Sequence, residues 1–155
     1  MGTSSSIRIT GDGFAALPAN VNLNAAASGT WVATGLALVL PSAGIYQLDA
    51  VVRTVLGTMT TGESAFISVR LYDVTGAAVV PNSEVLAHQL SVGAGTSATL
   101  LTWNRTAPLA IRYAVPGART VRLEAARVTS NGTTDQAQVV SDANGRTTLR
   151  YQRVA

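Results

Sequence analysis

The 155-residue sequence contains no cysteine, no lysine and a single histidine, His88. Without cysteine the chain forms neither disulfides nor thiolate ligands, and one imidazole does not supply the ligand set of a zinc site. A G-x-S-x-G elbow and a paired-carboxylate motif are also missing. We therefore expect no catalytic residue, no bound metal and no cofactor, and the chain is not predicted to be an enzyme. His88 lies in an alternating stretch and is expected to be a structural or surface residue.

Charge is scarce as well. Charged residues make up 12% of the chain and hydrophobic residues 47%, whereas about 25% of a typical domain is charged. This composition excludes a disordered chain. Because surface charge usually keeps a monomer soluble, the sparse charge favours an oligomer or a larger assembly.

The basic residues are all arginines, and they are unevenly distributed. Residues 1–100 contain three Arg and five acidic residues, while residues 101–155 contain eight Arg and three acidic residues. The basic final third could bind an acidic partner, but the strand-like spacing of its Arg favours ion pairs across neighbouring strands. Aromatic residues make up only 5%, so no stacking platform for bases is evident, and nucleic acid is not an expected partner.

No apolar run reaches the length of a membrane span, and the first residues, M-G-T-S-S-S, lack the apolar core of a signal peptide. We expect a soluble chain that is made in the cytoplasm and has no membrane partner. A chain of this length typically forms one domain.

The stretch from Gly44 to Leu56 has the clearest pattern. Residues of one parity are apolar and those of the other are polar, which is the two-residue period of a strand with one buried face. The turn residues Pro41 to Gly44 precede the strand and fix the parity that faces inward. The inward set is Tyr46, Leu48, Ala50 and Val52, and the outward set is Gln47, Asp49 and Arg53.

Similar runs between turn residues predict further strands. The strand at 31–40 is expected to form a hairpin with the strand at 44–56. In the strand at 65–74, Ile67, Val69 and Leu71 are expected inside, and Phe66 and Tyr72 outside. The remaining strands are expected at 83–91, 97–103, 109–115, 120–128, 137–140 and 147–154. Eight to ten short antiparallel strands without a confident helix are typical of an all-β sandwich.

One segment is compatible with two structures. The run from Val121 to Arg127, V-R-L-E-A-A-R, contains good helix formers. Its clean alternation and its short length between turn residues favour a strand, and the helix stays open as the alternative.

Residues 1–30 are rich in Ser, Gly, Asn and Ala, with only short apolar pieces. They predict an extended N-terminal arm with one or two short strands, followed by a β-sandwich domain at residues 31–155. Such an arm is ordered chiefly by a partner, so residues 1–24 are expected to anchor the chain. The alternative is that Ile7–Ile9 or Val21–Leu23 forms an edge strand of the domain's own sheet.

Three motifs resemble functional sites in letters only. Gly93 to Ala98 matches G-x-G-x-x-A, but a strand follows it where dinucleotide binding requires a helix. Asp142 to Gly145 resembles a fragment of a calcium loop without its remaining ligands, and its Asn-Gly favours a tight hairpin turn. Asn104 and Asn131 begin glycosylation sequons, which are used only on a secretory route.

Three segments carry a family resemblance. They are the G-I-Y strand at 44–46, the F-I-S-V-R-L-Y strand at 66–72, and a final strand that follows a glycine, Gly145 to Tyr151. They resemble the jelly roll of the tumour necrosis factor superfamily and of the globular head of complement's q subunit. The family's collagen stalk, secretory signal and cysteines are absent here.

Stand-alone domains of this kind, rich in Ala, Thr and Arg, are similar to small virion proteins of phages. The resemblance implies a jelly-roll β-sandwich in a trimeric capsid decoration protein, which binds the major capsid protein or another virion subunit and is located in the virion. Trimer contacts are expected at Phe66 and Tyr72. The alternative function is a receptor- or glycan-binding tip of a tail or head fibre, with Trp31 or Trp103 as sugar-stacking platforms.

Overall fold

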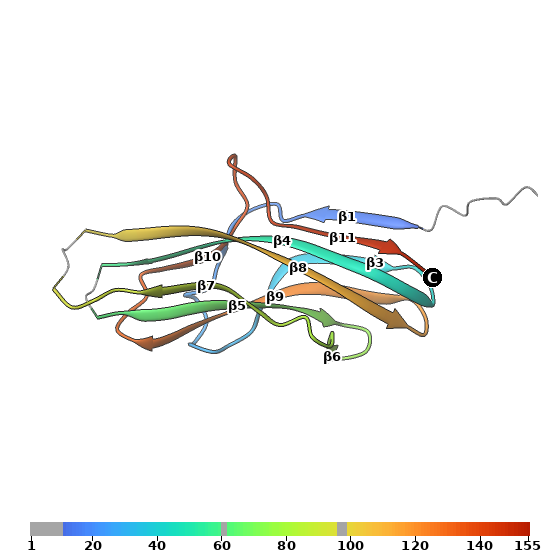
Figure 1. Ribbon diagram of the computed structural model, residues 1–155, viewed down its shortest axis with the longest axis horizontal. Helices are drawn as coiled ribbons and strands as arrows, with labels where there is room; N and C mark the ends of the chain where they lie inside the picture. The colour runs from blue at the N-terminus through green and yellow to red at the C-terminus, as the bar shows by residue number, and fades with distance from the viewer. Residues whose placement is uncertain (1–10, 60–61, 96–98) are drawn as a thin grey trace, which may run out of the picture.

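The chain folds into a β-sandwich (Figure 1). The computed structural model describes residues 11–59, 62–95 and 99–155, and these residues contain strands and no helix. The strands are β1 (Asp12–Ala16), β2 (Val21–Asn22), β3 (Val32–Leu40), β4 (Gly44–Thr58), β5 (Ser64–Asp73), β6 (Ala78–Val79), β7 (Val85–Ser91), β8 (Leu101–Val115), β9 (Arg119–Asn131), β10 (Gln136–Val140) and β11 (Thr148–Arg153). The predicted all-β fold is confirmed, and no helix long and apolar enough to cross a membrane occurs in the described ranges.

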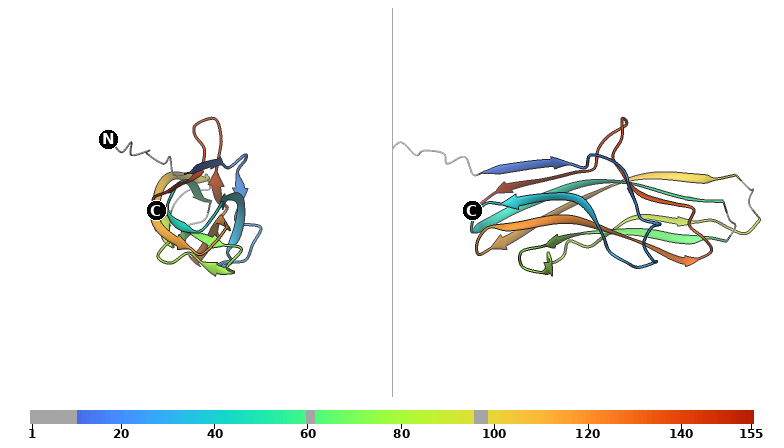
Figure 2. Two further views of the ribbon diagram at one scale, coloured as in Figure 1. Left: turned by 90° about the vertical axis from the view of Figure 1, so that its right-hand side faces the viewer. Right: turned by 180° about the vertical axis from the view of Figure 1, so that it is seen from behind.

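Two antiparallel sheets face each other across the core. One contains β1 and β2, β10 and β11, β4, and β8; the other has the order β3-β9-β5, with β6 and β7 both paired to β5. Most connections pass from one sheet to the other, which is the arrangement of a jelly roll. The sandwich is elongated, and the beginning of β1 and the C-terminus lie at the same end (Figures 1 and 2).

Strand β4 organises its sheet. It pairs with β8 over its full length, from Gly44 to Thr58, and with β11 and β10 along its other edge. Tyr46, Leu48 and Val52 are each at most 1% exposed, so the predicted inward parity of this strand is correct.

Strands β10 and β11 lie end to end along one edge of β4, where Val140 pairs with Arg53 and Thr148 with Val51. Residues 141–147 between them protrude from the sheet (Figure 1). The turn Asp142–Gly145 closes on itself through two backbone hydrogen bonds. The predicted tight turn at Asp142–Gly145 is therefore confirmed, but β10 and β11 do not pair with each other, because both pair with β4 and the chain continues in the same direction after the protrusion.

Two predictions about connections are wrong. Strand β3 pairs with β9 in the opposite sheet, so residues 31–40 and 44–56 form no hairpin. The strands expected at 97–103 and 109–115 both fall in one strand, β8, which begins at Leu101. Residues 97 and 98 lie outside the described residues. Pro108 lies in the middle of β8, opposite Val51. Proline is tolerated there because β8 is an edge strand, whose outer side needs no backbone donor.

The alternative of an edge strand holds for the described part of the predicted arm. Strand β1 pairs with β11, and β2 pairs with β10. Leu17 and Leu23 are each 1% exposed in the core. Residues 11–30 are therefore part of the sandwich, and the sandwich does not begin at residue 31. Ile7–Ile9 lies outside the described residues, and anchoring by this segment stays a prediction.

The strand predicted at 120–128 is confirmed, since these residues lie within β9 and pair with both β3 and β5. Sheet pairing on both sides decides against the helix alternative.

The sandwich has two halves with different interiors. The terminal half holds Tyr46, Leu48 and the C-terminus, and its interior consists mainly of large apolar side chains. The loop half holds the far ends of β4, β5 and β9, and its interior mixes apolar residues with Thr54, Thr58, Glu63 and His88, each at most 3% exposed.

Candidate functional site

The first candidate site is the outer face of the sheet that contains β1, β11, β4 and β8. Register pairs Val51 with Pro108, and Ile45 with Ala114, so these side chains share the solvent-facing side. Phe14 on β1 lies opposite Arg150 on β11. The outer face is defined by Phe14, Ile45, Val51, Pro108, Ala110 and Ala114.

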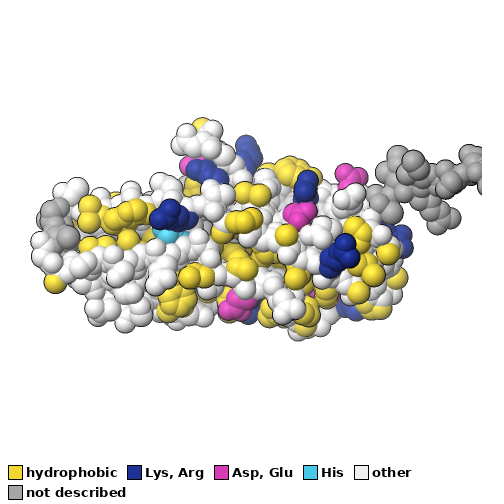
Figure 3. Space-filling view, in the orientation of Figure 1, with side chains coloured by type: hydrophobic (Ala, Val, Ile, Leu, Met, Phe, Trp, Pro, Cys, Tyr) yellow, Lys and Arg dark blue, Asp and Glu magenta, His cyan; other side chains and the backbone are white. Residues whose placement is uncertain are grey.

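This outer face exposes several apolar side chains, and polar and charged side chains of the same parity, among them Gln47, Asp49 and Arg112, lie between them. Phe14 is 66% exposed, Val51 44% and Ile45 40%. The charges between them are partly neutralised, because Arg150 Nε lies 3.2 Å from Asp49 Oδ2. In the view of Figure 3, hydrophobic side chains are spread along the molecule and charged groups are few. A broad weakly charged surface of this kind is suited to burial against another subunit.

On the opposite sheet, arginine side chains lie over the rings of Trp31 and Tyr72. The Arg70 guanidinium lies 4.0 Å from the ring centre of Trp31 and 5.8 Å from that of Tyr72, and it pairs with Glu124 at 2.8 Å. Arg122 pairs with the same carboxylate at 2.6 Å. Glu124 is on the outward parity, yet it is 3% exposed because these guanidinium groups cover it.

The residues predicted to contact neighbouring subunits on this sheet are only half accessible. Phe66 and Tyr72 are half-buried, and Tyr72 also lies 5.0 Å from the Arg122 guanidinium. Trp31 is half-buried under Arg70, while Trp103 is 37% exposed. Of the two predicted sugar platforms, Trp103 is therefore the more accessible.

The second candidate site lies in the loop half. Glu63 is 1% exposed, and neither of its carboxylate oxygens has a hydrogen-bond partner. Gly132 packs against its backbone, so closely that a Cβ at Gly132 would lie 3.0 Å from Glu63 Cα. A buried unpartnered carboxylate costs free energy, so this position departs from the pattern of a stable core.

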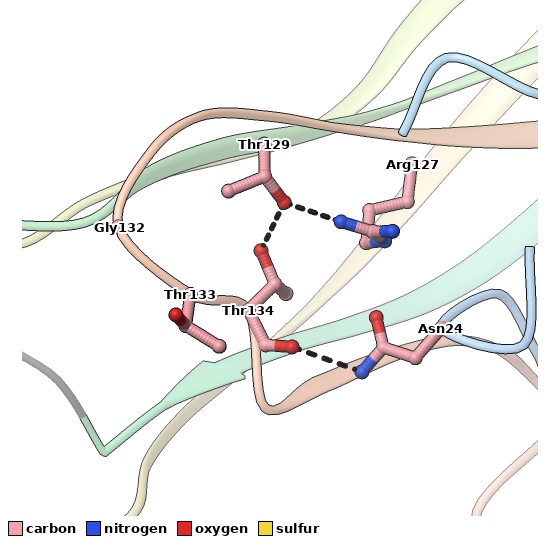
Figure 4. A pocket seen from close by; sticks show the side chains of 6 residues that line it. All are labelled: Asn24, Arg127, Thr129, Gly132, Thr133 and Thr134. Atoms are coloured by element: carbon pink, nitrogen blue, oxygen red, sulfur yellow. Dashed lines mark hydrogen bonds between the residues drawn. The ribbon is translucent and has the colours of Figure 1, made fainter. Parts of the chain in front are cut away.

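A polar hollow of about 250 Å³ opens beside Gly132. We call it the Asn24–Arg127 hollow; its lining is Asn24, Arg127, Thr129, Gly132, Thr133 and Thr134 (Figure 4). Thr129 Oγ1 lies 2.6 Å from Thr134 Oγ1 and accepts a hydrogen bond from Arg127 Nη1. Asn24 Oδ1 and Arg127 Nε are both buried and have no partner.

His88 lies inside the sandwich rather than on its surface, with 3% exposure. Its Nδ1 is 3.2 Å from Thr54 Oγ1. Burial, and secondly the positive charge of Arg105, lower the pKa of His88 to about 4. The imidazole is therefore neutral near pH 7, and its role as a structural residue stays a prediction.

A second cross-sheet contact lies in the terminal half. The Tyr113 hydroxyl on β8 donates to Asp73 Oδ2 on β5 at 2.7 Å. Burial, together with this hydrogen bond and the Asp73 charge, raises the pKa of Tyr113 to about 12. Asp73 also accepts from Gly76 N at 2.8 Å and lies 3.8 Å from Arg119, so this buried carboxylate is well satisfied.

The three motifs that resembled sites lie apart from the hollow or have structural partners. Gly93 to Gly95 form a loop after β7, and the rest of that motif, residues 96–98, lies outside the described residues. Asp142 binds Arg53 at 2.8 Å. Asn104 is exposed on β8, and Asn131 donates to the Gly62 carbonyl at 2.6 Å. Over the described ranges, no three His, Asp or Glu side chains gather to hold a metal.

Comparison with known proteins gives only distant structural matches. No protein-family model and no curated protein matches the sequence. A solved structure of infectious bursal disease virus, strain Gx, has 13% identity and a TM-score of 0.43, and the match covers 95% of this chain and 36% of that chain. The VP2 subviral particle of the same virus has 11% identity and a TM-score of 0.43, with 93% and 37% covered. This chain thus spans about a third of the length of the chains it matches.

Neither candidate site was identified from the sequence. The sequence pattern could have indicated that Arg127 points inward, because it shares the inward parity of Val121, Leu123 and Ala125. The approach of Asn24 to Arg127 had no local signal, because it depends on how the chain crosses between sheets.

Proposed function

We propose that this chain is a structural subunit of a virion and that it binds another subunit through the outer face. The observation that carries the proposal is the group of exposed apolar side chains formed by Phe14, Ile45 and Val51, together with Pro108 and two alanines of the neighbouring strand β8. Burial of such a surface contributes about 25 cal/mol per Å² of apolar area. The sparse overall charge also supports a subunit that is covered in its assembly.

In its finer form, the proposal is a homotrimeric capsid decoration protein of a bacteriophage. The family resemblance of the G-I-Y and F-I-S-V-R-L-Y strands supports this form. The expected partner is the major capsid protein. Because Phe66 and Tyr72 are half-buried, the outer face is a better candidate for subunit contacts than the surface around those two residues.

The test compares two substitutions of the same kind. Val51→Asp places a charge in the outer face, whereas Val39→Asp places it on β3 in the other sheet, where Val39 is 59% exposed. We expect Val51→Asp to abolish binding to particles that lack this protein and Val39→Asp to retain it. Light scattering of the same variants measures the oligomeric state. A wild-type chain that stays monomeric and is absent from purified particles would refute the proposal.

The second candidate function is a receptor- or glycan-binding tip. Two observations favour it: the exposed Trp103 and the polar Asn24–Arg127 hollow. Binding to cells or to isolated surface glycans, with no binding to particles, would favour this function over the first.

A further inference from the structure

The first part of β8, from Leu101 to Ala107, is an unpaired edge of the sandwich. Among the described residues, β8 pairs only with β4. In Figures 1 and 2 this part of the strand (yellow) runs along the margin of the molecule, with no described strand beyond it. One side of its backbone therefore has no strand partner.

The hydrogen bonds of β4 show which way its backbone groups point. Arg53 N donates to Thr147 Oγ1 at 3.0 Å, and the Gly57 carbonyl accepts from Asp135 N at 3.0 Å. Thr147 adjoins β11 and Asp135 adjoins β10. The backbone groups of Arg53 and Gly57 therefore point away from β8, which lies along the other edge of β4.

The register then fixes the outward residues of β8. Thr106 lies opposite Arg53, and Thr102 lies opposite Gly57. In an antiparallel pair, two residues directly opposite each other either bond to each other or both point away. The N–H and C=O groups of Thr102 and Thr106, and of Asn104 between them, therefore point outward. They pair with no strand in the described ranges.

This part of β8 is also uncovered on both faces. Every residue from Thr102 to Thr106 is exposed. Trp103 and Arg105 have the inward parity of Leu109, which is 4% exposed, yet Trp103 is 37% exposed because the opposite sheet leaves this end open. A strand with one free edge and two open faces is a template for a further strand.

Pro108 and Arg105 restrict what can pair with this edge. Pro108 has no N–H and shares the outward parity of Thr106, so a partner strand can bond only to the residues before it. A charge of inward parity, such as Arg105, normally protects an edge, because pairing would bury it. Arg105 takes part in none of the ion pairs of the described residues. A partner strand must therefore supply a group that accepts a guanidinium.

The same strand of a second copy supplies this group. When two copies pair antiparallel about Asn104, Trp103 of each copy lies opposite Arg105 of the other, and Thr102 lies opposite Thr106. Every outward N–H and C=O of Thr102, Asn104 and Thr106 then has a partner. Side chains directly opposite each other have Cβ atoms about 4.5–5.5 Å apart, which is close enough for direct contact.

A guanidinium over the face of a tryptophan ring is a favourable contact. This chain already contains one, because the Arg70 guanidinium lies 4.0 Å from the ring centre of Trp31. The two-fold pairing would form the contact twice between Trp103 and Arg105. The two Arg105 side chains lie diagonally across the two-fold axis, so their repulsion weakens the pairing and added salt should strengthen it.

We propose that the edge of β8 from Leu101 to Ala107 binds the same edge of a second copy, as an antiparallel strand pair centred on Asn104. The inference goes beyond the proposed function, and the paired segment contains none of the residues that define the outer face. A two-fold contact also joins chains of two different trimers, so it is compatible with the trimeric form. The pairing covers Trp103, which is then not free to stack on a sugar.

The first test introduces single cysteines into the full-length chain. The chain has no cysteine of its own, so one introduced thiol forms a protein disulfide only with another copy. Asn104→Cys places the two Cα atoms about 5.5 Å apart, which is within disulfide range. Thr102→Cys is the matched control on the same outward parity, because the two copies of Thr102 are offset by roughly 13 Å along the strands. With oxidised glutathione as the oxidant, we expect a disulfide-linked dimer from Asn104→Cys and a monomer from Thr102→Cys on a non-reducing gel.

The second test measures the dimer without a cross-link. Because one strand pair buries less area than a standard interface, we expect sedimentation equilibrium of the wild type to show a weak, concentration-dependent dimer. Asn104→Pro removes the central N–H and should weaken the dimer by about tenfold or more. Ala110→Pro removes an outward N–H beyond the paired segment and should behave like the wild type. Circular dichroism of each variant reports whether it is folded.

Four results would overturn the proposal. The first is a wild-type chain that stays monomeric at its highest soluble concentration. The second is an equal yield of disulfide-linked dimer from Asn104→Cys and Thr102→Cys. The third is self-association that Val51→Asp abolishes and Asn104→Pro leaves unchanged, which would assign it to the outer face. The fourth is a monomer that loses particle binding on Asn104→Pro, which would assign the edge to a strand of another subunit.

Discussion

Buried polar groups are treated differently in the two halves of the sandwich. In the terminal half, Glu124 is held by two guanidinium groups, and Asp73 by a tyrosine hydroxyl, a backbone amide and an arginine. In the loop half, both carboxylate oxygens of Glu63 lack partners, as do single atoms of Asn24 and Arg127.

This difference shows where the fold is complete by itself. A buried polar group with its partners is nearly neutral for stability, whereas one without them is destabilising. The terminal half therefore serves as the scaffold, with fully buried apolar side chains such as Tyr46 and Leu48 in its interior. The loop half keeps polar groups that the protein alone does not satisfy, which is typical of a region that binds something.

The largest effect is expected in the scaffold. Leu48→Ala removes a side chain that is 1% exposed at the centre of β4, and it should lower the free energy of unfolding by about 2–5 kcal/mol. Urea denaturation measures the change. Gln47→Ala on the same strand is the control and should cost no more than about 0.5 kcal/mol. Equal losses for both variants would contradict the inward parity of β4.

The second largest loss of stability is expected when the charge of the Glu124 carboxylate is removed. Glu124→Gln removes the negative charge between Arg70 and Arg122 and leaves two partly buried cations without a counter-charge. We expect a loss of about 3 kcal/mol in the free energy of unfolding. A loss below about 0.5 kcal/mol would show that this pair behaves like an ordinary surface salt bridge.

The third effect is a pH dependence in the loop half. The pKa of His88 is lowered to about 4 in the folded chain, against about 6.5 in an unfolded one. Between these values the unfolded chain binds the proton and the folded chain does not, so stability is fully present above about pH 6.5 and falls as the pH drops toward 4. We expect a loss of about 2 kcal/mol, after allowance for solvent screening.

The His88→Gln variant isolates this contribution, since glutamine does not titrate and can still hydrogen-bond to Thr54. The difference between the stability–pH curves of wild type and variant should contain the loss below pH 6.5. Superimposable curves would show that His88 is protonated equally in both states.

The smallest expected change is a gain in stability and not a loss. Glu63→Gln removes an unpartnered buried charge and should raise the free energy of unfolding by about 1 kcal/mol. The same chemical change at Glu124 destabilises, so the pair of variants compares the two halves directly. If both variants lost stability to a similar extent, Glu63 would have a partner in solution and the contrast between the halves would fail.

Local alternation predicted much of the sandwich. The buried sides of β4 and β5 followed from their period of two, because exposure changes at each residue of a half-buried strand. The choice of sheet could not be predicted in this way. Pro41 to Gly44 is compatible with a hairpin or with a crossover, and only the pairing of β3 with β9 decides between them.

The candidate sites were harder to predict for two physical reasons. Arg127 has the inward parity of its strand, but arginine is rarely buried. Residue type and strand parity therefore gave opposite predictions for the side chain of Arg127. The outer face depends on the register between strands far apart in the sequence, such as Phe14 opposite Arg150. Neither register nor crossover leaves a local signature at these residues.

The protruding loop at residues 141–147 has a practical consequence. It leaves and rejoins the same edge of β4, and Arg53 secures its base through Asp142 and the Gly145 carbonyl. The pairing of β10 and β11 with β4 is therefore independent of how long the loop is. A foreign peptide placed between Ala143 and Asn144 would extend into solvent without changing either register, which makes this position an insertion point for peptide display.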